Sequence, residues 1–397
     1  MISYSWEDAA AAEVIHDEFA LRGFDVIHDR YSFAEGSRIP TNMNTGVERC
    51  DVFVTYLTPN SLYLNGSSDD ARPALVGELS PALRRRRQNL IGGQPDVPMI
   101  VTIAHGLGPR EEAVESVRKH TGEDIGSLWS PVWLDQTTDR LTQSEAAAIA
   151  EHAAMSLLTL QRPSSPIQLN IATRGTTPRP VRFTLDATRI LGNERRPGSP
   201  IDWARFHAAL ASITESLNRS ETRSIRLELS CHLAAAYAAG RSFHQATGWQ
   251  LTVPTRHGDV TPAASGDGLP IRGDFDQYRE TGDLLIDIDL LGHNVASGAD
   301  NIAARLLPLG GRISLSRDTS DDLMPLEIAT LAHKAAAIVR SSHAALRPRT
   351  LHVMIAAPAA FAALFGYHLT ALNAEALLYE FGPGGYTEAL TIPSTAP

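Results

Sequence analysis

The chain opens with Ile2-Ser3-Tyr4-Ser5-Trp6-Glu7-Asp8, a short apolar strand that runs into a polar turn. An amphipathic helix pattern follows, then Gly23-Phe24-Asp25-Val26, a polar loop over Asp29–Pro40, and the apolar strand Asp51-Val52-Phe53-Val54-Thr55-Tyr56-Leu57. Strand and helix patterns that alternate in this way are typical of βαβ units and a parallel sheet. The opening stretch therefore predicts an α/β domain of doubly wound, flavodoxin-like design.

The alternation continues to about residue 160. Expected strands are Ile2–Ser5, Phe24–Ile27, Val52–Leu57, Pro98–Ile103 and Pro131–Leu134, and expected helices lie near 7–22, 40–49, 72–87 and 142–160. Residues 161–180 are rich in Pro, Ser and Thr, which is typical of a linker or an extended crossing segment. We therefore expect an N-terminal domain at 1–160, a linker at 161–180 and a C-terminal domain at 181–397.

The C-terminal region shows the alternation twice. Its first half predicts strands Ser224–Ser230 and Trp249–Val253 around a helix at 232–243. Its second half predicts strands Leu284–Leu291, Gly311–Ser316, Leu351–Ala356 and Ala376–Phe381, with helices near 299–307, 325–345 and 358–368. Two consecutive units of similar design suggest an internal pseudo-repeat.

Composition limits the classes of function. The chain has 397 residues, 43% of them hydrophobic and 20% charged, which suits two or three globular domains. A net charge of −10 argues against binding long nucleic acid through a basic surface. Only two cysteines occur, Cys50 and Cys231, so no disulfide framework is expected. With no visible signal peptide and no membrane-spanning apolar run, we expect a cytoplasmic protein.

Candidate site residues of the N-terminal domain gather at one edge of its predicted sheet, because ligands of doubly wound sheets bind beyond the carboxyl ends of the strands. One carboxylate, Glu78, lies on the expected helix near 72–87, after the strand Val52–Leu57. Its acidic side chain would project toward the same edge. The other candidates at this edge are Tyr4, Ser5, Trp6, Arg30, Ser32 and Thr58.

In their order, these elements resemble a TIR domain of the bacterial type, over roughly residues 1–160. Many such domains cleave NAD+, and the resemblance places Glu78 where the NAD+-cleaving members carry their glutamate. It implies that NAD+ is a substrate and that no cofactor or metal is needed. The Asp29–Pro40 loop corresponds to the segment that mediates TIR–TIR contacts in the family. One position departs from the pattern, since many TIR domains carry Trp four residues before the glutamate and this chain has Ala74.

A single carboxylate is chemically sufficient for this reaction. The nicotinamide of NAD+ is a cationic pyridinium that departs neutral, so no general acid is required. A carboxylate can oppose the positive charge of an oxocarbenium-like ribose. The alternative is that Glu78 is a solvated helix residue, one of 45 acidic residues. The run Arg84–Arg87 has two readings as well, a phosphate patch or, as we prefer, solvated charges that favour the helix C-terminus.

In the C-terminal domain, strand-to-helix junctions are the candidate anion sites. Free N–H groups and the helix dipole at such junctions favour a phosphate. Arginines and a threonine that follow strands can add charge or stack on bases. The candidate residues are Ser230, Cys231, His232, Thr255, Arg256, Gly292, His293, Asn294, Arg317, Ala357 and Pro358.

The stretches His244–Val253, Leu284–Leu290 and Leu351–Phe361, followed by Leu364-Phe365-Gly366 and Leu377–Phe381, resemble a SAVED domain over about 180–397. SAVED domains resemble two fused CARF-like (Rossmann-like) units and bind cyclic di- or trinucleotides. A TIR domain fused to SAVED resembles the effectors of bacterial cyclic-oligonucleotide antiphage signalling (CBASS). The resemblance implies a cyclic oligonucleotide activator, with cyclic tri-adenylate favoured, and head-to-tail oligomers or filaments in which the Asp29–Pro40 loop of one copy completes the Glu78 pocket of another.

Two rival functions remain open. The TIR domain can be a non-catalytic scaffold, although Glu78 argues against it. Asp287 and Asp289 alternate onto one strand face and could hold Mg2+ for a nuclease of the signal nucleotide. No third ligand accompanies them in the sequence, so we favour ion pairing. The 14 histidines show no zinc-binding spacing, and Gly382-Pro383-Gly384-Gly385 is predicted to be a turn.

Overall fold

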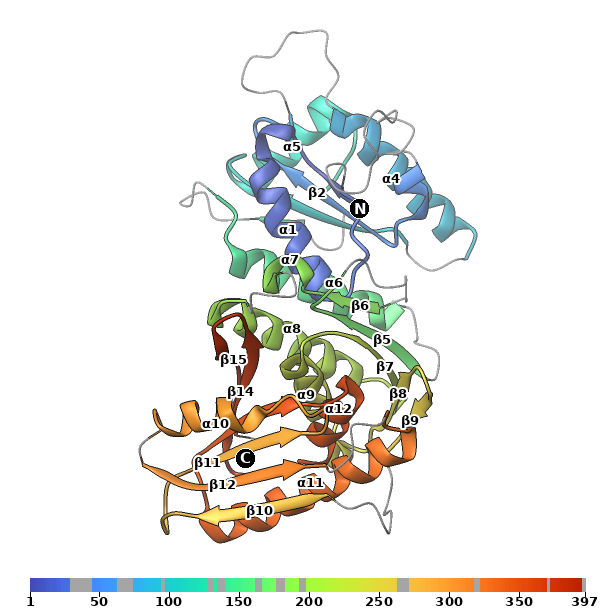
Figure 1. The fold of residues 1–397 in the computed structure, drawn as a ribbon. Coiled ribbons are helices and arrows are strands. Elements are labelled where there is room, and N and C mark those ends of the chain that lie inside the picture. The colour runs from blue at the N-terminus through green and yellow to red at the C-terminus, as the bar shows by residue number, and fades with distance from the viewer. Residues whose placement is uncertain are drawn as a thin grey trace. The chain divides into compact units, whose positions relative to one another are not determined.

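Figure 1 shows a computed structural model of the protein, which divides into two compact units, Met1–Arg162 and Pro163–Pro397. The structure describes residues 1–28, 45–62, 74–93, 97–126, 131–133, 140–160, 166–175, 183–192, 198–262, 271–306, 308–317, 322–369 and 372–394. Within these ranges, no helix combines the length and the hydropathy that a bilayer crossing requires.

The first unit is a doubly wound α/β domain, as predicted. Its parallel sheet has the order β1-β2-β3-β4, and helices lie on both faces. The strands are β1 (Ile2–Ser3), β2 (Val52–Leu57), β3 (Met99–Ala104) and β4 (Pro131–Trp133). The helices are η1 (Trp6–Asp8), α1 (Ala9–Leu21), α4 (Ala74–Ile91), α5 (Arg110–Thr121) and α6 (Gln143–Leu160). One core cluster lies under α1 and α6, and the other lies under α4 and α5. Every residue of β2 and β3 is buried, and both strands are apolar except at Thr55 and Thr102.

Two predictions for this unit were wrong in detail. β1 ends at Ser3 because the Asp8 N–H donates to Ser5 O (2.7 Å) and starts a 3-10 turn. The expected strand Phe24–Ile27 forms no ladder, although the Ile2 N–H donates to Ile27 O (3.0 Å) at that edge. Helix α5 escaped prediction because it buries only two apolar side chains, Ala113 and Val117, and so shows a weak periodic pattern.

The second unit begins with a five-stranded sheet of order β6-β5-β7-β8-β9. Its strands are β5 (Ile167–Ala172), β6 (Phe183–Asp186), β7 (Ser224–Ser230), β8 (Gln250–Thr255) and β9 (Gly258–Val260). Its helices are α7 (Thr188–Leu191), α8 (Pro200–Asn218), α9 (Leu233–Ser242) and η2 (Gln245–Thr247).

Strand β5 corrects the linker expected at 161–180. This strand pairs in parallel with β6 on one side and β7 on the other, so it lies inside the sheet. The chain therefore enters its second unit at Pro163 rather than at residue 181. The six-residue strand was hidden because Pro- and Ser-rich stretches flank it on both sides.

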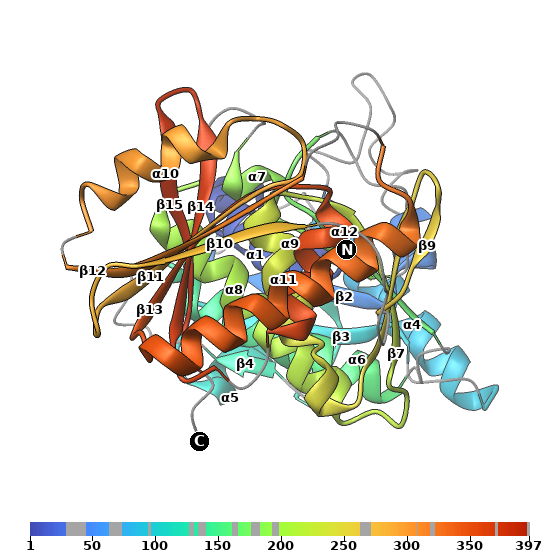
Figure 2. The same ribbon diagram turned by 60° about the horizontal axis from the view of Figure 1, so that its bottom comes forward.

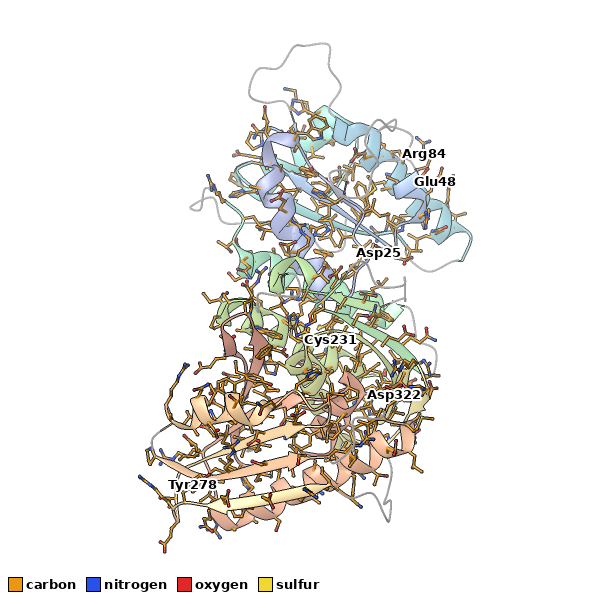
Figure 3. All side chains as sticks on the ribbon, in the orientation of Figure 1. Asp25, Glu48, Arg84, Cys231, Tyr278 and Asp322 are labelled. Carbon is orange, nitrogen blue, oxygen red and sulfur yellow. The ribbon has the colours of Figure 1, made fainter. Side chains whose placement is uncertain are left out.

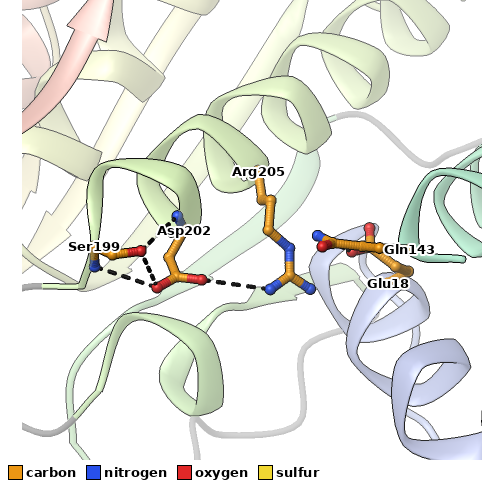
Figure 4. Close-up of polar contacts among 5 residues, drawn as sticks. All are labelled: Glu18, Gln143, Ser199, Asp202 and Arg205. Carbon is orange, nitrogen blue, oxygen red and sulfur yellow. Dashed lines mark hydrogen bonds and ion pairs between the residues drawn. The ribbon is translucent and has the colours of Figure 1, made fainter.

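Helix α8 was also missed, although its start carries a clear signal. Ser199 and Asp202 form a capping box, in which the Asp202 N–H donates to Ser199 Oγ (3.3 Å) and the Ser199 N–H donates to Asp202 Oδ2 (3.2 Å) (Figure 4). Pro200 occupies the first helical position, and Arg205 pairs with Asp202 (3.5 Å). The capping pattern Ser199-Pro200-Ile201-Asp202 could have revealed this helix.

The second unit continues with a six-stranded sheet of order β10-β12-β11-β13-β14-β15, whose edge strands β10 and β15 are antiparallel to their neighbours. The strands are β10 (Arg272–Gln277), β11 (Asp283–Asp289), β12 (Leu309–Ser316), β13 (Thr350–Ala356), β14 (Glu375–Gly382) and β15 (Gly385–Ile392). The helices are α10 (Val295–Ala303), α11 (Pro325–Leu346) and α12 (Ala359–His368). Helix α10 thus begins at Val295, before the expected start near 299, whereas the predicted turn at 382–385 joins β14 to β15.

Helices α9 and α12 cross at two glycines and join the two halves of this unit. They lie side by side in both ribbon views (Figures 1 and 2). A Cβ on Gly240 would lie 2.7 Å from the Ala363 carbonyl carbon, and one on Gly366 would lie 3.2 Å from the Tyr237 carbonyl carbon. Gly366 follows Gly240 by 126 residues, and Ala363 follows Tyr237 by the same number. The two contacts are therefore equivalent, and the crossing is reciprocal. The expected pseudo-repeat is therefore present as a pseudo-two-fold helix crossing.

Candidate functional site

The strand ends of the first unit bring aromatic residues together. Tyr4 follows β1 and stacks on His28, with ring centroids 5.0 Å apart and planes 8° apart. His16 of α1 meets the same imidazole edge-on at 5.7 Å. Trp6, by contrast, leaves 72% of its surface exposed, and Ser5 lies between the two aromatic residues at the start of η1. Tyr4 is therefore held in place, whereas Trp6 is largely exposed.

Thr58, which follows β2, is bound through its hydroxyl to Asp8 in the η1 turn after β1. The Thr58 hydroxyl donates to Asp8 Oδ2 (2.5 Å), and the Asn60 amide donates to Asp8 Oδ1 (3.3 Å). Thr58 is buried, and its backbone N–H donates to Ser61 Oγ (2.8 Å). The hydroxyl expected to bind substrate thus already has an internal partner, which holds two strand ends together.

Tyr56 and His105 form a second pair at this edge that sequence reasoning missed. The Tyr56 hydroxyl and His105 Nδ1 are 2.8 Å apart, and both residues are buried. His105 follows β3 directly, and its N–H donates to Leu57 O (2.9 Å), which places it beside Thr58. Burial raises the pKa of Tyr56, so this phenol stays protonated at neutral pH. The position of a histidine directly after an apolar strand was the signal available.

Glu78 is the fifth residue of α4, the helix that follows β2. A helix that follows a parallel strand begins near the carboxyl edge of the sheet, so Glu78 lies toward the edge that holds Tyr4 and Thr58. Its side chain is partly buried. Arg30, Ser32 and the rest of the Asp29–Pro40 loop lie outside the described residues.

The arginine run of α4 serves the fold at two positions. Arg85 donates to Val47 O (2.8 Å) and Cys50 O (2.6 Å), and thereby satisfies carbonyls at the end of the short helix before β2. Arg87 pairs with Glu123 at 3.1 Å on the surface. These contacts speak against a phosphate patch, but the preferred reading was also wrong, because α4 continues to Ile91 and the run lies before its last turn.

In the second unit, a buried carboxylate lies at the first expected phosphate junction, between β7 and α9. Glu380, near the end of β14, accepts from the Ala234 N–H (2.7 Å) at the start of α9 and from Arg174 (3.1 Å) after β5. Burial raises the pKa of Glu380, while the helix N–H groups and Arg174 oppose that shift. The carboxyl ends of β5, β7 and β14 therefore converge, but the α9 N-terminus already holds an internal anion.

Ser230, Cys231 and His232 line this junction without supplying positive charge. His232 is buried, its Nδ1 lies 2.7 Å from Thr173 Oγ1, and its backbone N–H donates to the same oxygen (2.8 Å). Burial, with the nearby Arg174 charge, lowers the pKa of His232 to about 3, so the ring is neutral at pH 7. Burial raises the pKa of the Cys231 thiol (labelled in Figure 3), and Ser230 O accepts from the backbone N–H groups of residues 173 and 174.

The second junction, after β11, repeats this arrangement. Asp289 accepts from the backbone N–H groups of Leu291 (3.2 Å), His293 (3.0 Å) and Val295 (3.4 Å), and so caps α10. Gly292 and Asn294 have φ values of 72° and 55°, which fold the loop around this carboxylate. The carboxylate of the strand thus already accepts from three of the N–H groups that were expected to face a phosphate. At the third junction, Pro358 is the N-cap of α12 rather than its expected first helical residue, and Ala357 is buried.

The remaining candidates also have internal contacts. The Thr255 hydroxyl donates to Gly258 O (2.8 Å), and Arg256 pairs with Asp322. Arg317 follows β12 at the edge where Asp289 ends β11.

Asp287 and Asp289, the two carboxylates of β11 that were considered as Mg2+ ligands, are used by the fold. Arg312 donates to Asp287 Oδ1 (2.6 Å) and to Asp300 of α10 (2.6 Å), and Ser314 Oγ donates to Asp287 (3.0 Å). Asp289 caps α10. Across the ranges that the structure describes, His, Cys, Asp and Glu side chains form no group of three suited to a metal ion. The ion-pair reading of Asp287 thus fits the contacts.

Comparisons with known families agree with this division. Residues 1–91 match the model of the TIR domain, and residues 206–392 match that of the "SMODS-associated and fused to various effectors sensor domain", or SAVED. A search of curated proteins gave no significant match. Among solved structures, an Acinetobacter baumannii Cap4 SAVED/CARF-domain receptor with the cyclic trinucleotide 2'3'3'-cAAA is 13% identical (TM-score 0.48, covering 89% of this chain and 86% of that chain). A Moraxella osloensis Cap4 SAVED/CARF-domain receptor is also 13% identical (TM-score 0.45, covering 98% of both chains).

Fold and family matches together define a two-part protein, in which a doubly wound domain precedes a pair of fused Rossmann-like halves. More specifically, the chain has a TIR domain at its N-terminus and a SAVED sensor domain at its C-terminus.

Proposed function

We propose that this protein is an NAD+ glycohydrolase that a cyclic oligonucleotide activates, and that it depletes NAD+ in the cytoplasm as an antiphage response. The observation that carries the proposal is the position of Glu78 on α4 of a TIR domain that is fused to a SAVED sensor.

Cleavage needs a carboxylate near the ribose and a support for the nicotinamide ring. Glu78 supplies the carboxylate, which opposes positive charge at the ribose while nicotinamide departs neutral. Tyr4, fixed against His28, and the exposed indole of Trp6 supply aromatic surface at the same sheet edge. The products are nicotinamide and ADP-ribose or a cyclised form of it.

The two related junctions of the SAVED unit differ in their side chains, which favours a ligand that lacks two-fold symmetry. Its pseudo-two-fold axis relates Ser230-Cys231-His232 to Ala356-Ala357-Pro358, so one junction carries polar side chains and the other carries none. A cyclic dinucleotide can share a two-fold axis, whereas a cyclic trinucleotide cannot. This difference favours the trinucleotide, and cyclic tri-adenylate is the first ligand to test.

Self-association supplies the regulation in this proposal. Ligand binding arranges TIR domains so that the Asp29–Pro40 loop of one copy completes the Glu78 pocket of the next. Head-to-tail contacts of this kind do not close on themselves, and they therefore produce filaments. A single copy with an intact Glu78 stays inactive.

The decisive measurement is the fluorescence of an etheno-NAD+ analogue, recorded with the full chain and a panel of cyclic di-, tri- and tetranucleotides. We expect cleavage only when an activating ligand is present. Glu78→Gln should abolish cleavage and leave ligand-induced assembly, followed by light scattering, unchanged. Glu115→Gln is the matched control, because Glu115 is a surface residue of α5 paired with Arg118.

The rival functions give different results. Absence of cleavage with every ligand, together with normal assembly, would identify a scaffold. Full activity in the Glu78→Gln protein would refute the site. Degradation of labelled ligand with Mg2+ would support the nuclease, although Asp287 and Asp289 are engaged with Arg312 and with the α10 N-terminus.

A further inference from the structure

Arg174 has hydrogen-bonding capacity that the fold leaves unused. This residue follows β5, and its backbone N–H donates to Ser230 O (3.1 Å), which holds it beside the start of α9. A guanidinium has five N–H donors. Within the described residues, the Arg174 guanidinium donates a hydrogen bond to Glu380 Oε2, and its buried Nε–H has no acceptor. About a third of the side chain (36%) is exposed. Glu380 therefore satisfies only part of the guanidinium, and the exposed part can bind an external anion.

Two other arginines of the second unit, Arg256 and Arg312, already pair with carboxylates other than Glu380. Arg256 pairs with Asp322, and Arg312 pairs with both Asp287 and Asp300. The neighbouring His232 is neutral, because burial holds its pKa near 3. Among the residues that the structure describes at the meeting point of β5, β7 and β14, Arg174 therefore supplies positive charge that a ligand can reach.

Glu380 holds this cation and also competes for it. The carboxylate accepts from the α9 N-terminus and from Arg174, so it places the guanidinium at the helix end. It is almost fully buried, with 4% of its side chain exposed, and its charge opposes that of any phosphate that approaches the same group.

We propose that Arg174 binds a phosphate of the cyclic oligonucleotide, and that Glu380 is a positioning residue that neutralises Arg174 until the ligand arrives. This inference rests on the proposed function, because it assigns a contact within the sensor that the SAVED domain provides. Arg174 lies in the segment that the sequence indicated as a linker, and no sequence pattern had marked it.

The test is the affinity of the full-length protein for cyclic tri-adenylate, measured by isothermal titration calorimetry. Arg174→Gln should weaken binding about ten- to a hundredfold, the range for one charge-assisted pair. Arg174→Lys should recover part of this loss, because it keeps the charge without the planar fork. Arg219→Gln is the matched control, since Arg219 pairs with Glu215 on the surface of α8 and the net charge changes equally.

Glu380→Gln distinguishes ligand contact from a merely structural pair. The amide oxygen can still accept from Ala234 N–H, but the competing charge is gone, so affinity should rise about tenfold. If Arg174 and Glu380 only held the fold together, both substitutions would weaken binding. Opposite changes in affinity therefore support the proposal.

Three results would overturn the assignment. If the Arg174→Gln and Arg174→Lys proteins bind as tightly as the native chain, Arg174 makes no ligand contact. If Glu380→Gln lowers affinity, the carboxylate does not compete with the ligand. If the native chain binds no member of the cyclic nucleotide panel, the proposed function itself fails, and this inference fails with it.

Discussion

Substituting Gly240 with alanine tests the crossing of α9 and α12, because the added methyl group has no space. Its Cβ would lie 2.7 Å from the carbonyl carbon of Ala363 and 2.9 Å from Tyr367 N, closer than carbon atoms pack in proteins. Both neighbours are backbone atoms, so no side chain can turn aside and the helices must separate. The change should therefore loosen the contact between the two halves of the SAVED unit.

The expected cost follows from two opposing effects. Overpacking a core costs about 1–3 kcal/mol, and a clash with backbone lies at the upper end of that range or above it. This cost is offset by about 1 kcal/mol, because alanine has a higher helix propensity than glycine. We expect a net destabilisation of about 2 kcal/mol or more, which lowers the melting temperature of a unit of this size by about 4–8 °C.

Differential scanning calorimetry of the full chain measures this shift, because a two-unit chain can show separate transitions. One transition should move down in the Gly240→Ala protein, and the other should stay in place. Gly366→Ala should move the same transition, since its contact is reciprocal. Gly384→Ala is the control, because no atom lies within 4 Å of its would-be Cβ. A Gly240→Ala protein that melts at or above the native temperature would refute the close crossing.

Two further predictions concern the SAVED unit. Arg312→Gln should destabilise it by about 3 kcal/mol, because buried Asp287 loses its ion pair, and hydrogen exchange should rise in α10. The solvent-exposed pair of Arg226 and Asp259 is the comparison, and Arg226→Gln should destabilise the unit much less. Stability should also fall as the pH falls from about 6.5 toward 3, because burial lowers the pKa of His232 to about 3 and that of His368 to about 4, whereas the unfolded chain takes up protons near 6.5. Urea unfolding at several pH values checks this sign, and His232→Gln should make the slope shallower. An equally steep slope in that variant would show that His232 is not the group responsible.

The alternating patterns predicted the fold class because central parallel strands such as β2 and β3 are largely apolar and buried on both faces. Helices and strands without such an apolar pattern were not predicted. β5 is short and is flanked by Pro- and Ser-rich stretches, and α5 buries only Ala113 and Val117. Helix α8 carried a capping box in its sequence, so that omission was avoidable.

Site residues were harder to predict. The end of a strand indicates where a site lies in the fold, but it does not indicate which side chain from elsewhere in the chain binds there. Ser230, Cys231 and His232 do lie at a strand-to-helix junction, yet the anion found there is Glu380, whose strand is remote in sequence. Asp289 likewise occupies the junction at Gly292 and His293. Both were expected to be open phosphate sites, since local sequence cannot reveal which carboxylate the fold brings back to a helix N-terminus.

The sequence by itself determined the architecture and the candidate chemistry. Periodic burial identified the parallel sheets, and the order of motifs indicated a TIR domain with Glu78 followed by a SAVED domain. Only the tertiary structure decided which donors and charges are left for a ligand. It paired Thr58 with Asp8, Arg256 with Asp322 and the α9 N-terminus with Glu380. It also left Arg174 with an unsatisfied donor. The physical reason is that burial patterns repeat locally along the chain, whereas hydrogen bonds and ion pairs join residues that only folding brings together.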